Sequence, residues 1–246
     1  MPARPGQSHK RYIEQAPQDS KAVENARDQR LKVRNLSSMF YLALFAAMSA
    51  TLILFLHAGR AADGLSNQEF QAKLNYCETC HGPSAQGFRG YFVMPRLAGQ
   101  HPQYIENQLR AFTERRRRNP VMFSVAHALR PILIPRLAAY FERLNPPPYG
   151  GAPRSGAAFG KKIFEEGLPE DNVPACFACH GLKAEGRGQI PRLAGQLYWY
   201  IIKVLSNWSA ERGQGAPDIS AIMLPTTHNL THAQVEALAA YLSGLK

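Results

Sequence analysis

Cysteine is scarce in this chain of 246 residues, which contains only four. Cys77 and Cys80 form one CxxC pair, and Cys176 and Cys179 form the other. A disulfide framework rarely consists of two such tight pairs and nothing else. The spacing therefore predicts that the cysteines hold a bound group and do not simply cross-link the fold.

The sequence also lacks the alternating polar and apolar runs that are typical of half-buried strands. Helical patterns occur instead over 66–76 and 155–166, and each of these stretches opens on a serine suited to N-capping. A third helical pattern, THAQVEALAAYLSGL, lies near the C-terminus. The predicted fold class is all-α.

Basic residues outnumber acidic ones, and the formal net charge of +11 favours anionic partners such as nucleic acid, anionic lipid or an acidic protein. The excess is uneven, because 151–246 holds nine basic and eight acidic residues, a net charge of +1. This near-neutral segment argues against a nucleic-acid role for the whole chain.

Charged residues are absent between Arg34 and Arg60, and MFYLALFAAMSATLILFLHA (39–58) has 17 apolar residues out of 20. A helix of about 20 apolar residues is long enough to cross a bilayer. This pattern predicts a transmembrane signal-anchor at 39–58, preceded by a basic cytoplasmic tail at 1–38. The predicted location is the inner membrane, with the rest of the chain in the periplasm. The alternative is a soluble periplasmic protein after signal-peptide cleavage, although Arg60 makes a poor cleavage site.

The hexapeptide PRLAGQ occurs twice, at 95–100 and 191–196, and it aligns the rest of the chain as a tandem repeat. CETCHG precedes the first copy and CFACHG the second, and each half ends in LAAY. Between the halves, NPPPYGGAPRSG is too rich in proline and glycine to continue a helix. We therefore expect two domains, at 63–145 and 155–246, joined by a Pro/Gly linker at 146–154.

Each half carries CxxCH, the attachment motif of a c-type haem. In that chemistry the two thiols bond covalently to the porphyrin, and the adjacent histidine binds the iron. The predicted sets are Cys77, Cys80 and His81 in the first half, and Cys176, Cys179 and His180 in the second. A thioredoxin-like redox pair would need a βαβ context, which the sequence lacks. A zinc site rarely combines CxxC with an immediate histidine in each of two repeats.

The repeat also selects a sixth iron ligand. Met122 and Met223 each stand 18 residues before the tyrosine of LAAY, so they occupy equivalent positions. Met94 aligns with Ile190 and has no counterpart in the second half, so we expect it to pack in the core. Met122 and Met223 are the predicted axial ligands.

A second pair of residues keeps the repeat spacing. His127 and His228 each follow the predicted methionine ligand by five residues. They leave bis-histidine ligation open as an alternative, while a solvent-facing histidine is the simpler interpretation.

Two CxxCH halves, each followed by PxLAGQ, an aromatic helix, a methionine and LAAY, resemble the dihaem cytochrome c4 family. The resemblance covers nearly all of 66–246 and implies two tandem class I cytochrome c domains with two covalently bound haem c groups. It further implies that the carbonyls of Pro95 and Pro191 accept hydrogen bonds from the proximal histidines. It places Leu97 and Leu193 against the porphyrin, where Gly99 and Gly195 let the backbone pass close to the haem.

Histidine and methionine together fill both axial positions and raise the potential, as suits electron transfer. We expect a membrane-tethered electron carrier rather than an enzyme. It would relay electrons from a respiratory dehydrogenase or quinol-oxidising complex to a terminal oxidase or reductase. The alternatives are a haem subunit of a larger dehydrogenase or oxidase complex, and a dihaem peroxidase. The run RRRR at 115–118 could steer an acidic partner, form a solvated helix end or lie near haem propionates.

Overall fold

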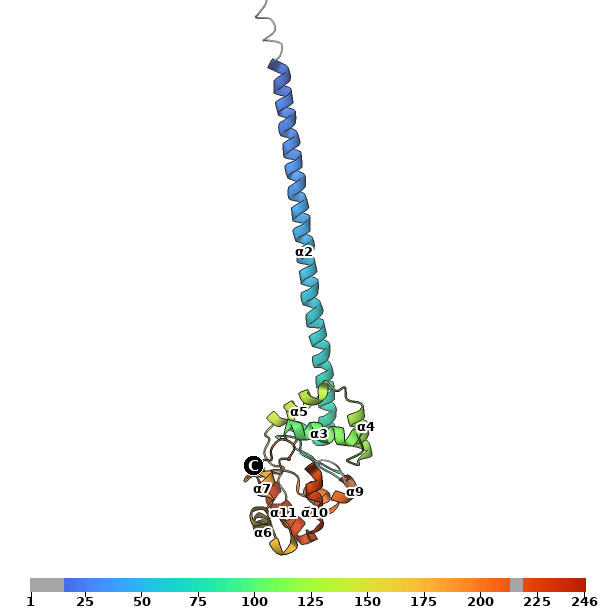
Figure 1. Cartoon of the computed structure of the whole chain (residues 1–246), viewed down its shortest axis with the longest axis vertical. Helices are drawn as coiled ribbons and strands as arrows, with labels where there is room; N and C mark the ends of the chain where they lie inside the picture. The colour runs from blue at the N-terminus through green and yellow to red at the C-terminus, as the bar shows by residue number, and fades with distance from the viewer. Residues whose placement is uncertain (1–15, 213–218) are drawn as a thin grey trace, which may run out of the picture. The chain divides into compact units, whose positions relative to one another are not determined.

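In the computed structural model, the residues described are 16–212 and 219–246 (Figure 1). The chain divides into two compact units, Met1–Asn67 and Gln68–Lys246. The long helix α2, Ala16–His81, begins in the first unit and contributes its last residues to the second. Of the predicted tail at 1–38, residues 1–15 lie outside the described part.

The predicted membrane anchor is not supported. A bilayer crossing needs about 20 consecutive apolar residues in one helix. Among the residues that the structure describes, no helix is at once long enough and apolar enough to meet this requirement. This finding contradicts the anchor predicted over 39–58 and the predicted location in the inner membrane.

The second unit is mainly helical and contains two hydrophobic cores, which correspond to the two halves of the repeat. The first core includes Leu74 at the end of α2 together with Leu133, Leu137 and Phe141. Its helices are α3 (Pro102–Thr113), α4 (Pro120–His127) and α5 (Leu133–Arg143), which lie together in Figure 1. The short helix η1 (Pro83–Ala85) and a small hairpin of strands β1 (Phe88–Arg89) and β2 (Val93–Met94) complete this half.

The second core is built around Ile163, Phe164, Leu238 and Leu242. Helices α6 (Ala157–Glu166) and α11 (His232–Gly244) supply these side chains and pack directly on each other. The remaining elements of this half are η2 (Pro169–Asp171), α7 (Phe177–His180), α8 (Tyr198–Ser206), α9 (Trp208–Arg212), η3 (Ile219–Ile222) and α10 (Met223–His228).

The helix starts differ in part from those predicted. Ser66 does not cap a helix, because α2 runs through it without a break, and no proline between 18 and 82 interrupts that helix. Helix α6 begins after Gly156, which adopts a left-handed φ of 80°, and not at Ser155. The C-terminal helix is confirmed: Thr231 and Gln234 form a reciprocal capping box at the start of α11.

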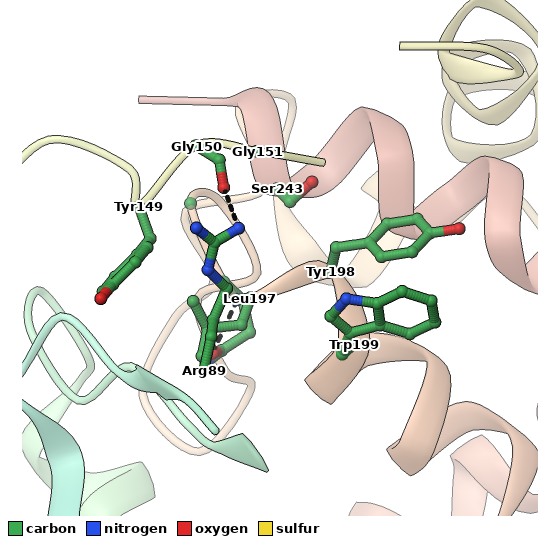
Figure 2. A pocket seen from close by; sticks show the side chains of 10 residues that line it. Arg89, Tyr149, Gly150, Gly151, Leu197, Tyr198, Trp199 and Ser243 are labelled. Carbon is green, nitrogen blue, oxygen red and sulfur yellow. Dashed lines mark hydrogen bonds between the residues drawn. The ribbon is translucent and has the colours of Figure 1, made fainter. Parts of the chain in front are cut away.

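The linker between the halves is held by Arg89 of β1. Its guanidinium donates a hydrogen bond to the carbonyl of Gly150 over 2.9 Å and lies 4.6 Å from the centre of the Tyr149 ring. Figure 2 shows Arg89 in the small pocket formed there, which Gln196 and Trp199 of the second half also line. The linker is therefore fixed against both halves of the second unit.

Candidate haem centres

Both CxxCH motifs lie at the ends of helices. Cys77, Cys80 and His81 form the last turn of α2, where residues three and four apart share one face. Cys176 precedes α7, which ends at His180. Glycines follow both histidines, and Gly82 and Gly181 have φ values of 81° and 80°, a backbone conformation that favours glycine. The two motifs thus present two thiols and an imidazole in a compact group.

The four thiols are free of disulfides. Cys80 and Cys179 are exposed, whereas Cys77 and Cys176 are half-buried. Burial raises the pKa of Cys77 and of Cys176 to about 11. These two thiols stay protonated near neutral pH, so neither Cys77 nor Cys176 is the low-pKa thiolate of a redox-active CxxC.

The ring of each predicted haem-ligating histidine is held by a proline carbonyl. His81 Nδ1 lies 2.8 Å from the carbonyl oxygen of Pro95, and His180 Nδ1 lies 3.0 Å from that of Pro191. These are the two hydrogen bonds that the resemblance implied. Burial lowers the pKa of both imidazoles and favours the neutral form. With Nδ1–H donating to a carbonyl, Nε2 keeps its lone pair for a metal.

The predicted methionine ligands share the buried faces of short helices. Met122 lies in the first turn of α4, and Ala126, one turn later, is that helix's buried residue. In α10, Met223 and the buried Thr227 repeat this i, i+4 relationship. Asn119 caps α4 by accepting a hydrogen bond from the amide of Met122 over 2.9 Å. Both halves therefore place a methionine on the inner face of the equivalent helix.

The alternative histidine ligands lie elsewhere on these helices. Five residues along a helix turn a side chain by roughly 140°, away from the face of the methionine. His127 and His228 are exposed at the last residues of α4 and α10, and the His127 ring stacks on Phe123. Met94 is in β2 and pairs with Phe88 across the hairpin. These positions favour the methionines at 122 and 223.

The two PRLAGQ segments contact each other, an arrangement that the repeat alone does not predict. The side-chain oxygen of Gln196 accepts from the amide of Arg96 over 2.8 Å, and its nitrogen donates to the Arg96 carbonyl over 3.1 Å. Gln100 makes the same two bonds to Arg192, at 2.9 and 3.1 Å. Both glutamines are buried. We call this reciprocal pair of contacts the glutamine clasp.

The glycines of the hexapeptides face this clasp. Gly99 and Gly195 have φ values of 75° and 70°, a conformation that few other residues adopt. A Cβ on Gly99 would lie 3.4 Å from Arg192 Cδ, and one on Gly195 would lie 3.2 Å from the carbonyl oxygen of Leu245. The positive φ values, more than the space left for a Cβ, therefore favour glycine at both positions.

The arginine run at 115–118 is divided by burial. Arg117 is buried and donates to Gln108 Oε1 over 2.8 Å and to the Tyr200 hydroxyl over 2.7 Å. Arg115 and Arg118 are exposed. Arg117 therefore joins the two halves and is not available to steer a partner, so the run does not act as one surface patch.

The residues present fit a covalently attached haem in each half. Each half offers two unpaired thiols at CxxCH spacing and a neutral imidazole with Nδ1 already bonded. Each also offers a methionine thioether on the side of a short helix that carries that helix's buried residue. Free CxxCH thiols are the attachment points of a c-type haem, and imidazole with a methionine thioether is the iron ligand pair of cytochromes c.

Comparison with known proteins agrees with this chemistry. The family model "Cytochrome c" matches residues 157–246. The chain is 36% identical over 217 residues to cytochrome c-552 of Acidithiobacillus ferridurans, covering 85% of this chain and 90% of that protein. It is 35% identical to the thiosulfate dehydrogenase electron acceptor of Thiomonas intermedia, covering 68% of this chain and 77% of the relative.

A solved structure shows the same arrangement. The cytochrome c4 of Acidithiobacillus ferrooxidans superposes with a TM-score of 0.60 at 38% sequence identity. The match covers 69% of this chain and 98% of that one, so it spans nearly all of the relative.

Proposed function

The chain belongs to the cytochrome c4-like family of dihaem cytochromes c, and on that premise we propose that it relays single electrons between two redox partners. It carries two covalently bound haem c groups, attached through Cys77 and Cys80 in one domain and Cys176 and Cys179 in the other. The observation that carries the proposal is a repetition. Each domain contains a buried histidine held by a proline carbonyl, and a methionine on the inner face of a short helix.

We assign His81 and Met122 as axial ligands in the first domain, and His180 and Met223 in the second. When bound, the haem iron supplies a one-electron couple. The chain's residues prepare the imidazoles that would bind this iron: the proline carbonyls fix the imidazole rings, and burial keeps those rings neutral. With His81 and Met122, or His180 and Met223, holding the iron, no coordination position would remain for peroxide or oxygen. Leu97 and Leu193, which pack at the edges of the two cores, would cover the porphyrin.

The partners follow from this chemistry. We propose a respiratory dehydrogenase or quinol-oxidising complex as donor, and a terminal oxidase or reductase as acceptor. A relative that accepts electrons from thiosulfate dehydrogenase supports a dehydrogenase as donor. The same relative is compatible with the alternative function, in which this chain is a haem subunit of a larger dehydrogenase complex. Stoichiometric co-purification with such a complex would reveal that function.

Rapid mixing tests the proposal. The oxidised dihaem protein is mixed with catalytic amounts of a thiosulfate dehydrogenase and excess thiosulfate, with the mixture lacking thiosulfate as the control. We expect both haems to become reduced, with two electrons taken up per chain, and then to be reoxidised on addition of a terminal oxidase. Failure to exchange electrons with any dehydrogenase or oxidase, together with rapid turnover of hydrogen peroxide, would contradict electron relay and favour a peroxidase.

A further inference from the structure

The glutamine clasp touches the same peptide units that hold the proximal histidines. The carbonyl of Pro95 and the amide of Arg96 belong to one planar, conjugated peptide group. Its oxygen accepts from His81 Nδ1 at 2.8 Å, and its N–H donates to Gln196 Oε1 at 2.8 Å. A continuous hydrogen-bonded path therefore runs from a side chain of the second domain to the proximal histidine of the first.

The same path exists in the opposite direction. The peptide group of Pro191 and Arg192 accepts from His180 Nδ1 at 3.0 Å and donates to Gln100 Oε1 at 2.9 Å. Gln100 and Gln196 are 5% and 7% exposed, so little water competes for these bonds. Hydrogen bonds in such chains polarise one another, and the effect is larger in a buried environment.

We propose that each glutamine is a positioning residue for the haem of the other domain and that it lowers that haem's reduction potential. An acceptor on the peptide N–H increases the negative charge on the carbonyl oxygen. The carbonyl then binds the histidine N–H more strongly, which makes the imidazole a better electron donor and stabilises oxidised iron. The inference rests on the proposed function because it takes His81 and His180 as iron ligands.

A purely structural role for the glutamines predicts a different pattern. Gln196 Oε1 also accepts from the amide of Leu197 over 3.0 Å, beside α8, and Gln100 Oε1 accepts from the amide of His101 over 3.1 Å, beside α3. Loss of these bonds would disturb the glutamine's own domain, and a looser interface would affect both haems alike. Only the relay predicts an effect that crosses to the other domain.

The test uses Gln196→Leu and Gln100→Leu in the full dihaem protein. The two potentials are resolved by NMR redox titration, with each haem identified by contacts to its own cysteines. Gln196→Leu should shift the one-electron equilibrium of the haem on Cys77 and Cys80 at least threefold toward the reduced form. This shift raises the potential of that haem by about 28 mV, at 59 mV per tenfold change. The potential of the haem on Cys176 and Cys179 should change by less than half as much. Gln100→Leu should do the reverse, with the larger rise at the haem on Cys176 and Cys179.

A second readout reports on the bond itself. In the reduced protein, the Nδ1–H proton resonance of His81 should move upfield in Gln196→Leu, because its hydrogen bond weakens. Gln196→Glu keeps the oxygen acceptor and adds charge to it, so the same resonance should move downfield. This variant also serves if the leucine variant fails to fold.

Asn107→Leu is the matched control for a weaker interface. Asn107 donates across the domains to Gln189 over 3.2 Å but touches neither hexapeptide, so it should leave both potentials unchanged. Shifts confined to the glutamine's own domain, equal shifts of both haems, or no shift would overturn the relay. If the variants keep wild-type haem spectra, these outcomes leave the assigned ligands and the proposed electron transfer intact.

Discussion

Arg117 of the first haem domain donates a hydrogen bond to the hydroxyl of Tyr200 in the second, over 2.7 Å. The equivalent contact in the other direction, from Arg212 to the Tyr104 hydroxyl, is longer at 3.3 Å. Both arginines are buried, and both also donate to Gln108 Oε1. The two arginine–tyrosine contacts therefore follow the repeat, one short and one long, whereas Gln108 of the first half accepts from both arginines at the same distance of 2.8 Å.

Removing the Tyr200 hydroxyl should destabilise the protein more than removing that of Tyr104. Tyr200→Phe leaves a buried guanidinium N–H without its short bond, and we expect a loss of about 1–3 kcal/mol in the free energy of unfolding. Tyr104→Phe, which removes only the longer bond, should cost less. Denaturant unfolding of the dihaem protein measures both, and an equal or reversed order would show that bond length does not govern this interface.

The contact between α6 and α11 requires glycine at position 160. A Cβ there would collide with the backbone carbonyl of Ala237, which cannot move without shifting α11. Gly160→Ala should therefore destabilise the second domain by about 3 kcal/mol. Gly244→Ala is the control, because a Cβ at the end of α11 would meet nothing within 4 Å. Thermal unfolding followed at both haems compares the two, and equal stability of both variants would contradict the close packing.

The assignment of histidine and methionine as iron ligands predicts how the wild type and a methionine variant react with hydrogen peroxide. With both axial positions filled, the reduced wild-type protein should not consume hydrogen peroxide at an enzymatic rate. Met122→Ala opens the sixth position of one haem, so peroxide should then oxidise that haem faster than the other. Stopped-flow spectra of the reduced proteins measure this, and rapid peroxide turnover by the wild type would contradict six-coordinate haems.

Much of the site follows from local sequence. CxxCH places its three groups within one helical turn, and the proline carbonyls lie where the family pattern indicates. The repeat register selects Met122 and Met223 by position alone. The structure adds that each lies on the buried face of its helix, but their role as ligands stays a prediction.

Contacts between the domains could not be read in the same way. Gln196 and Arg96 are 100 residues apart, so no local pattern links them, and the duplicated hexapeptide signalled only that some role was repeated. The burial of Arg117 was likewise hidden within a run that resembles a solvated helix end. The serines at 66 and 155 are good caps in isolation, but a continuous helix and a left-handed glycine determine where these helices begin.

The most direct test of histidine–methionine ligation is a visible-spectrum redox titration of the wild type and of Met122→Ala, Met223→Ala and Met94→Ala. The ligand assignment predicts that each of the first two variants loses half of the methionine–iron band, with a lower potential at one haem. Met94→Ala should keep the whole band and both potentials. A full band in Met122→Ala or Met223→Ala, or a band halved in Met94→Ala, would contradict it.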